Sequence, residues 1–159
     1  MTDLLDRVRQ QVAGMFARND YPVDTMPDGS GYRLVVGSTE TVISFDEWDH
    51  DIVITLNAVL LTDAPQRGRP RTLMLERINE LNRTIPLGKV FATDADPDTE
   101  SPSMLLLEYQ LLGKNLDLSE FMPALEHVAS LADELDETLK TQLGGHRFFE
   151  EEEEDALDT

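Results

Sequence analysis

The feature that most constrains the fold is the stretch from Leu75 to Phe121, where the residues themselves mark several element boundaries. It predicts the end of an amphipathic helix, a turn bounded by Pro86 and Gly88, two strands, and an acid-capped return into a long helix. Because helix and strand signals follow one another in a single short segment, the chain is expected to form an α+β domain. No catalytic motif lies in this stretch.

The rest of the chain extends this order towards both ends. Hydrophobic residues at helical spacing predict a first helix that ends before Pro22, and alternating residues then predict three strands joined by short polar links. The further predicted ranges are strands at 32–36, 41–45 and 51–61, a helix at 71–84, strands at 89–93 and 104–112, and a helix at 119–143. The expected fold class is therefore α+β, with an antiparallel sheet and the order α-β-β-β-α-β-β-α.

Composition limits the range of functions. The chain has 159 residues, no cysteine and a formal net charge of −19, and seven of its last ten residues are acidic. We expect one cytoplasmic domain at residues 1–145, with an acidic, disordered tail at residues 146–159. No run of eighteen apolar residues predicts a membrane span. Such a charge repels nucleic acid and anionic membranes and favours cationic partners, although a saline habitat would also select it.

Part of the amino-acid sequence resembles a known family. The residues that carry the resemblance are the run from Ile78 to Phe91 (INELNRTIPLGKVF), then Leu107–Leu112 (LEYQLL) and Leu118–Phe121 (LSEF). Over roughly residues 3–145 the chain is similar to the YbjN family, which is similar in fold to the type III secretion chaperones. The resemblance implies an α+β domain, often dimeric, that binds a segment of a partner protein. It implies no catalytic residue.

Three arginines stand in one short loop, Arg67-Gly68-Arg69-Pro70-Arg71. This pentapeptide has the core of an AT-hook, which lays Arg side chains into the narrow minor groove of A·T-rich DNA. The alternative is a surface loop that enters a helix, with Pro70 in the first turn. Three bases at a helix N-terminus oppose the helix dipole, so a compensating anion is expected there.

Aromatic residues mark two further candidate contacts. Phe148 and Phe149 precede five glutamates, which could form a docking peptide or a solvated tail that keeps the protein soluble. We also expect this tail to lie transiently over Arg67–Arg71. Trp48 lies in an acid-rich turn, where it could cap the core or anchor a partner.

Chemistry-bearing residues form no recognisable site. Asp94, Asp96 and Asp98 alternate as in a calcium loop, but the expected glycine and closing glutamate are missing. The acid-rich turn at residues 46–51 and the three scattered histidines have no ligand or nucleophile spacing. We therefore expect no catalytic residue, no metal site and no cofactor, and an enzyme is the third choice.

The leading hypothesis is a non-catalytic protein- or peptide-binding module of chaperone or adaptor type, acting as a homodimer. Its candidate partner-binding residues are Trp48, Arg67, Arg69, Arg71, Phe148 and Phe149. The alternative is a regulatory protein that contacts DNA, or a DNA-binding partner, through the Arg67–Arg71 loop.

Overall fold

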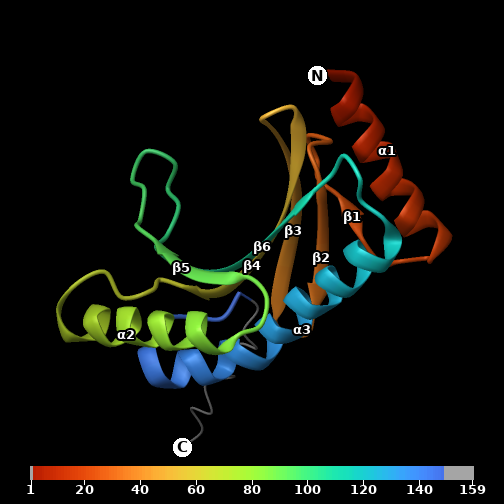
Figure 1. Ribbon diagram of the computed structural model, residues 1–159. Helices are drawn as coiled ribbons and strands as arrows, with labels where there is room; N and C mark the ends of the chain where they lie inside the picture. The colour runs from red at the N-terminus through yellow and green to blue at the C-terminus, as the bar shows by residue number, and fades with distance from the viewer. Residues whose placement is uncertain (1, 149–159) are drawn as a thin grey trace, which may run out of the picture.

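The fold is a six-stranded antiparallel sheet with three α-helices, seen in a computed structural model that describes residues 2–148 (Figure 1). The elements are α1 (Thr2–Arg18), β1 (Asp24–Thr25), β2 (Tyr32–Val36), β3 (Thr39–Trp48), β4 (Asp51–Thr62), α2 (Gly68–Thr84), β5 (Lys89–Thr93), β6 (Met104–Leu112) and α3 (Leu118–Leu143). The predicted α+β class is confirmed. None of the described helices is both long enough and apolar enough to cross a bilayer.

The structure differs from the predicted elements in a few places. Strand β1 was not predicted, because its two residues, Asp24 and Thr25, are too few to show an alternation of apolar and polar side chains. Strand β3 extends to Trp48, which therefore ends a strand instead of lying in a turn. Helix α3 is capped by Asp117, whose Oδ1 accepts a hydrogen bond from the Glu120 backbone N–H at 3.1 Å.

The strand order in the sheet is β1-β2-β3-β4-β6-β5. The long strand β4 lies at the centre, and β6 is inserted between β4 and β5, so the chain crosses from β4 to the edge strand before it returns. Residues paired across antiparallel strands point to the same face of a sheet. The registers therefore assign each side chain to one of two faces, apart from a shift between Val59 and Leu61.

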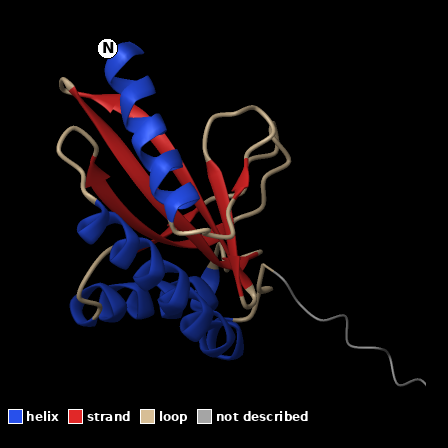
Figure 2. Cartoon of the chain, turned by 90° about the vertical axis from the view of Figure 1, so that its right-hand side faces the viewer, coloured by secondary structure: helices blue, strands red, loops and turns tan. Residues whose placement is uncertain are grey.

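One face of the sheet holds the hydrophobic core. Helix α3 packs on it through Phe121, Leu125 and Val128, all fully buried. Helix α1 lies across the same face (Figure 2), where the Phe16 ring meets the Phe121 ring with centroids 5.7 Å apart. We call this the covered face.

Helix α2 closes one edge of the sheet. Its buried residues Met74 and Leu81 face the core. The Asn82 side chain then pairs with the outer backbone of β5: its Oδ1 accepts from the Val90 N–H at 2.7 Å, and its Nδ2 donates to the Val90 carbonyl at 3.0 Å. Asn82 thus makes the two bonds that a further strand would make, so this edge is blocked at Val90.

The chain turns back after α3 and pairs once more with the sheet. The Thr62 N–H donates to the His146 carbonyl at 2.7 Å, and the His146 N–H donates to the Thr62 carbonyl at 2.9 Å. Gly145 makes this close approach possible, because its φ is +81° and a Cβ there would lie 2.7 Å from the Thr62 carbonyl oxygen. The predicted tail began at His146, but this residue still belongs to the fold.

Candidate functional site

The sheet has a second face, on which no described helix packs. We call it the open face. It comprises Arg33 and Val35 of β2; Glu40, Val42, Ser44, Asp46 and Trp48 of β3; Val53, Thr55, Asn57 and Val59 of β4; Leu106, Glu108, Gln110 and Leu112 of β6; and Lys89, Phe91 and Thr93 of β5. Large apolar side chains lie exposed on it, with Trp48 at 59%, Leu112 at 54% and Val35 at 45% exposure.

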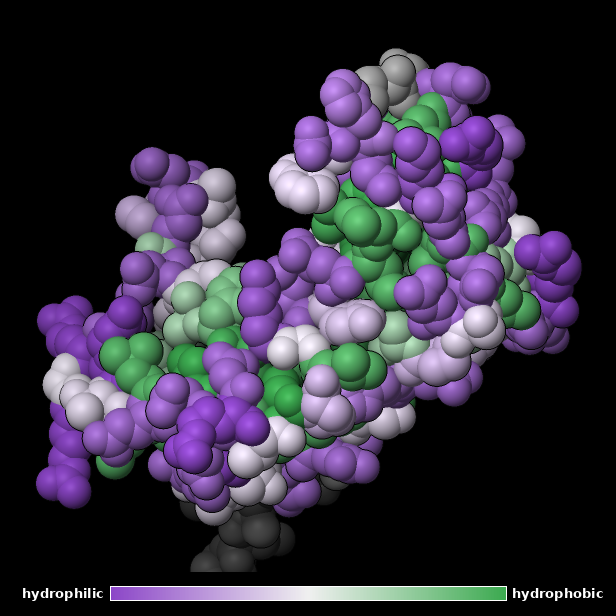
Figure 3. Space-filling model, viewed as in Figure 1, coloured by the Kyte–Doolittle hydropathy of each residue, from purple (hydrophilic) through white to green (hydrophobic). Residues whose placement is uncertain are grey.

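A hollow of about 340 Å³ lies at one end of the open face, lined by Trp48, Val53, Gln110, Leu111 and Leu112. Figure 3 shows the molecule hollowed between the β3–β4 hairpin and the β5–β6 loop, with hydrophobic surface gathered near the end of β6. We call the lining set the Trp48 hollow. An exposed ring beside an exposed leucine in a concave site is the arrangement that typically anchors a partner.

Two hydrogen bonds of the backbone after β6 fix the wall of this hollow. The Gly113 N–H donates to the Ile52 carbonyl at 2.7 Å, and Asp51 Oδ1 accepts from the Lys114 N–H at 2.8 Å. A Cβ on Gly113 would lie 2.8 Å from Val8 Cγ1, so the end of β6 lies close against α1. The position of Leu112 is therefore fixed by the fold.

A row of polar residues crosses the middle of the open face. The register places Arg33, Asn57, Glu108 and Lys89 in one row across the sheet, with Val42 of β3 between Arg33 and Asn57. Lys89 Nζ lies 3.1 Å from Glu108 Oε1, whose side chain is 12% exposed. Asn57 Oδ1 is buried without a hydrogen-bond partner among the described residues. The centre of the open face thus carries hydrogen-bonding groups. Apolar residues lie on both sides of them: Trp48, Val53 and Leu112 towards one end, and Val59, Leu106 and Phe91 towards the other.

Glu40 lies next to this row with unusual electrostatics. Burial raises the pKa of its carboxyl above the ordinary value, and the Arg33 guanidinium, 3.4 Å away, offsets only part of that rise. The cause is the loss of water around the carboxylate, which disfavours its charged form. A cationic group placed over the open face would favour the charged form of Glu40.

Acids gather at the end of the hairpin that carries Trp48. Asp46, Glu47, Asp49 and Asp51 lie within the end of the β3–β4 hairpin, and Asp49 and His50 form its turn with φ values of 44° and 65°. Such positive values at both central residues suit a two-residue hairpin turn. Within residues 2–148, no group of three His, Asp or Glu side chains is arranged to hold a metal ion.

The structure separates the predicted site residues into two places. Trp48, the last residue of β3, lies beside the start of β4, whereas Arg67, Arg69 and Arg71 follow the end of β4. The twelve residues of β4 give the strand a length of roughly 40 Å, which separates the two places. Arg67 occupies the N-cap position of α2, Arg69 is exposed, and Arg71 lies 3.4 Å from Asp94. Phe148 is half-buried, and Phe149 lies outside the described residues.

Sequence reasoning missed Val53, Leu112 and the polar row. The alternation of Val53, Thr55, Asn57 and Val59 along β4 was a usable signal, because it gives that strand one partly polar face. What no local pattern revealed is that β6 pairs with β4, which places Leu112 opposite Val53.

Comparisons with known proteins agree with this architecture. Residues 2–151 match the family TY-Chap1, described as "T3SS (YopN, CesT) and YbjN peptide-binding chaperone 1". A solved structure of YbjN from E. coli, titled as a putative transcription regulator, is similar with a TM-score of 0.55 and 15% identity, covering 87% of this chain and 93% of that one. No curated protein matches. The chain therefore belongs to the TY-Chap1 family of peptide-binding chaperone domains, and the predicted resemblance to YbjN and the type III secretion chaperones is confirmed.

Proposed function

We propose that this protein binds an extended segment of a partner protein on the open face, with an apolar side chain of that segment in the Trp48 hollow. The observation that carries the proposal is the pair of exposed side chains, Trp48 and Leu112, on either side of a hollow in an uncovered sheet. Membership of a peptide-binding family supports the same reading. The proposed activity is non-catalytic and needs no cofactor.

The chemistry of the open face favours a segment that is apolar and basic. The end of the β3–β4 hairpin that carries Trp48 also carries four acids, and the whole chain has a net charge of −19. A basic segment would be steered towards this surface at low salt, while burial of its apolar residues would supply most of the affinity. Partly buried Glu40 and Glu108 would receive its cations.

Intrinsic fluorescence tests the proposal directly, because Trp48 is the only tryptophan. The probe is a synthetic extended peptide in which leucine and lysine alternate, and the control peptide has glutamate in place of lysine. We expect the leucine–lysine probe to shift the Trp48 emission to shorter wavelength as water leaves the ring. The glutamate peptide should leave the emission unchanged.

Variants locate the binding site. Leu112→Ser should lower the affinity for the probe about tenfold or more, which corresponds to about 1.4 kcal/mol or more. Leu75→Ser is the matched control, because Leu75 is similarly exposed, at 47%, but lies on α2 and not on the sheet. Equal losses of affinity in the two variants would contradict the proposed site.

The same proposal includes a homodimer, as the family resemblance implies, and a cytoplasmic setting, which the lack of cysteine favours. Large apolar side chains outside the open face are exposed as well, among them Leu87 and Leu118. Light scattering should therefore give about twice the chain mass of 17.9 kDa at micromolar concentration. A stable species of the monomer mass across a wide concentration range would remove the homodimer from the proposal.

A further inference from the structure

A second concave surface lies at the other end of the molecule, between the start of α2 and the end of α3. It is a groove of about 210 Å³, lined by Arg69, Pro70, Leu73, Gln142 and Leu143. Leu73 is 42% exposed, although it lies on a packed helix. We call this the arginine groove. Its lining combines apolar side chains with a cation, so it suits a ligand that is both apolar and acidic.

The charges beside the groove are not balanced locally. Arg71 pairs with Asp94 at 3.4 Å. Within the described part of the chain, Arg67 and Arg69 make no ion pair or side-chain hydrogen bond. The first turn of α2 contains no acid, and its N-cap residue makes no side-chain cap. Two exposed guanidinium groups therefore stand next to the groove in a chain that is otherwise strongly acidic.

The fold brings the end of the described chain close to this groove. His146 is held against Thr62 by two backbone hydrogen bonds, and Thr62 precedes Arg67 by five residues. Five residues span at most about 17 Å. Glu150–Glu154 follow His146 by four to eight residues, so their reach is at most about 14–28 Å. The later glutamates, Glu152–Glu154, have a reach of at most about 21–28 Å from His146, so they can span the distance from Thr62 to Arg67.

We propose that the arginine groove is the docking site of the chain's own C-terminal segment, residues 149–159. Phe149 supplies the apolar contact with Leu73 and Leu143, and Glu150–Glu154 supply anions for Arg67 and Arg69. Exposed ion pairs are individually weak and are screened by salt, so the docked state is populated at low ionic strength and lost at high ionic strength. The groove lies far from the Trp48 hollow, and this proposal does not depend on the proposed function.

Nuclear magnetic resonance of the full chain tests the proposal. The reporters are the methyl groups of Leu73 and Leu143 and the Nε–H of Arg69. In the unmodified chain these signals should move between about 10 mM and about 1 M salt, because the Debye length falls from about 30 Å to about 3 Å. A full-length variant with all five of Glu150–Glu154 changed to Gln should show the high-salt positions already at low salt.

A control variant tests whether charge removed from a distant site moves the same reporters. Glu47→Gln with Asp49→Asn removes charge from the opposite end of β4, and it should leave the three reporters where they are in the unmodified chain. If the reporter signals of the glutamine variant and of the unmodified chain have the same positions at low salt, the proposal is wrong. Reporter shifts that grow with protein concentration would also overturn it, because they would assign the groove to an acidic segment of a second molecule.

Discussion

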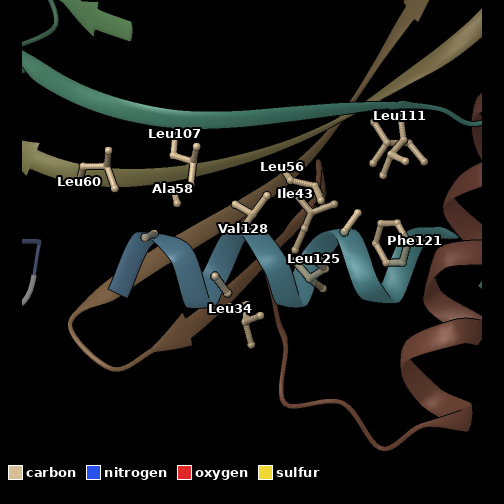
Figure 4. Packing of buried hydrophobic residues seen from close by; sticks show 14 of the residues in the cluster. Leu34, Ile43, Leu56, Ala58, Leu60, Leu107, Leu111, Phe121, Leu125 and Val128 are labelled. Atoms are coloured by element: carbon tan, nitrogen blue, oxygen red, sulfur yellow. The ribbon is translucent and has the colours of Figure 1, made fainter. Parts of the chain in front are cut away.

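The two faces of the sheet are built from the same strands but have opposite characters. Along β4, Ile54 and Leu56 point to the covered face and are fully buried, whereas Val53 and Asn57 point to the open face and are partly exposed. Figure 4 shows Leu125 and Val128 of α3 packed beside Ile43 and Leu56 of the sheet. One face therefore supplies the hydrophobic core, and the other carries exposed apolar side chains such as Trp48 and Leu112.

The largest contrast should come from replacing one leucine on each side. Leu125→Ala leaves a cavity at a site with 0% exposure, so we expect a loss of about 2–5 kcal/mol in the free energy of unfolding. Leu112→Ala removes a side chain that is 54% exposed, and we expect a change within about 0.5 kcal/mol. Urea denaturation measures both, and similar losses would contradict the division between the faces.

The closed edge at β5 should give the next largest effect. Asn82→Ala removes both hydrogen bonds to Val90 and leaves two backbone groups without partners. We expect a loss of about 1–3 kcal/mol in the free energy of unfolding, again measured in urea. Asn79→Ala on the same helix is the control: Asn79 is exposed, so its replacement should cost less than about 0.5 kcal/mol.

A pH series sharpens the description of the open face. Because the pKa of Glu40 is raised in the folded state, its contribution to stability is fully present below the ordinary value of 4.5 and is lost as pH rises through the folded pKa. Glu40→Gln cannot ionise, so it should be more stable relative to the unmodified chain at pH 7 than at pH 4. Thermal unfolding at the two pH values measures this difference in stability. A Glu40→Gln variant that gains more stability at pH 4 than at pH 7 would contradict a raised pKa for Glu40.

The smallest effect is expected for DNA. Each arginine of the loop could release about one counterion from a phosphate, but the acidic chain repels the duplex. We therefore expect no retention of an A·T-rich duplex at physiological salt in a mobility-shift assay. Retention that is lost on Arg69→Ala would instead favour the regulatory alternative.

Much of the fold was predictable because it is encoded locally. The helix that ends before Pro86, the strands on either side of Asp94–Ser103 and the glycines after α3 follow from spacing and turn chemistry. The position of β6 between β4 and β5 was not predictable, because pairing between distant strands depends on the packing of the whole core. Helix α3 begins one residue earlier than predicted, because Asp117 caps it.

The candidate site was only partly predictable for the same reason. Trp48 stands out in the sequence as a lone aromatic residue among acids. Its partners in the hollow come from β4 and from the end of β6, which are far from each other in sequence. Asn82 gave no local signal for its role, since its bonds depend on where the edge strand lies.

We expect the partner segment to bind on the open face, and not on the covered face or at an edge of the sheet. Mapping amide and methyl chemical shifts of the labelled full chain during titration with the leucine–lysine probe tests it most directly. We expect the changes to concentrate at Trp48, Val53 and Leu112 and to continue across the polar row to Glu108. Changes confined to α2 or to the outer edge of β2, with Trp48 and Leu112 unmoved, would contradict the claim.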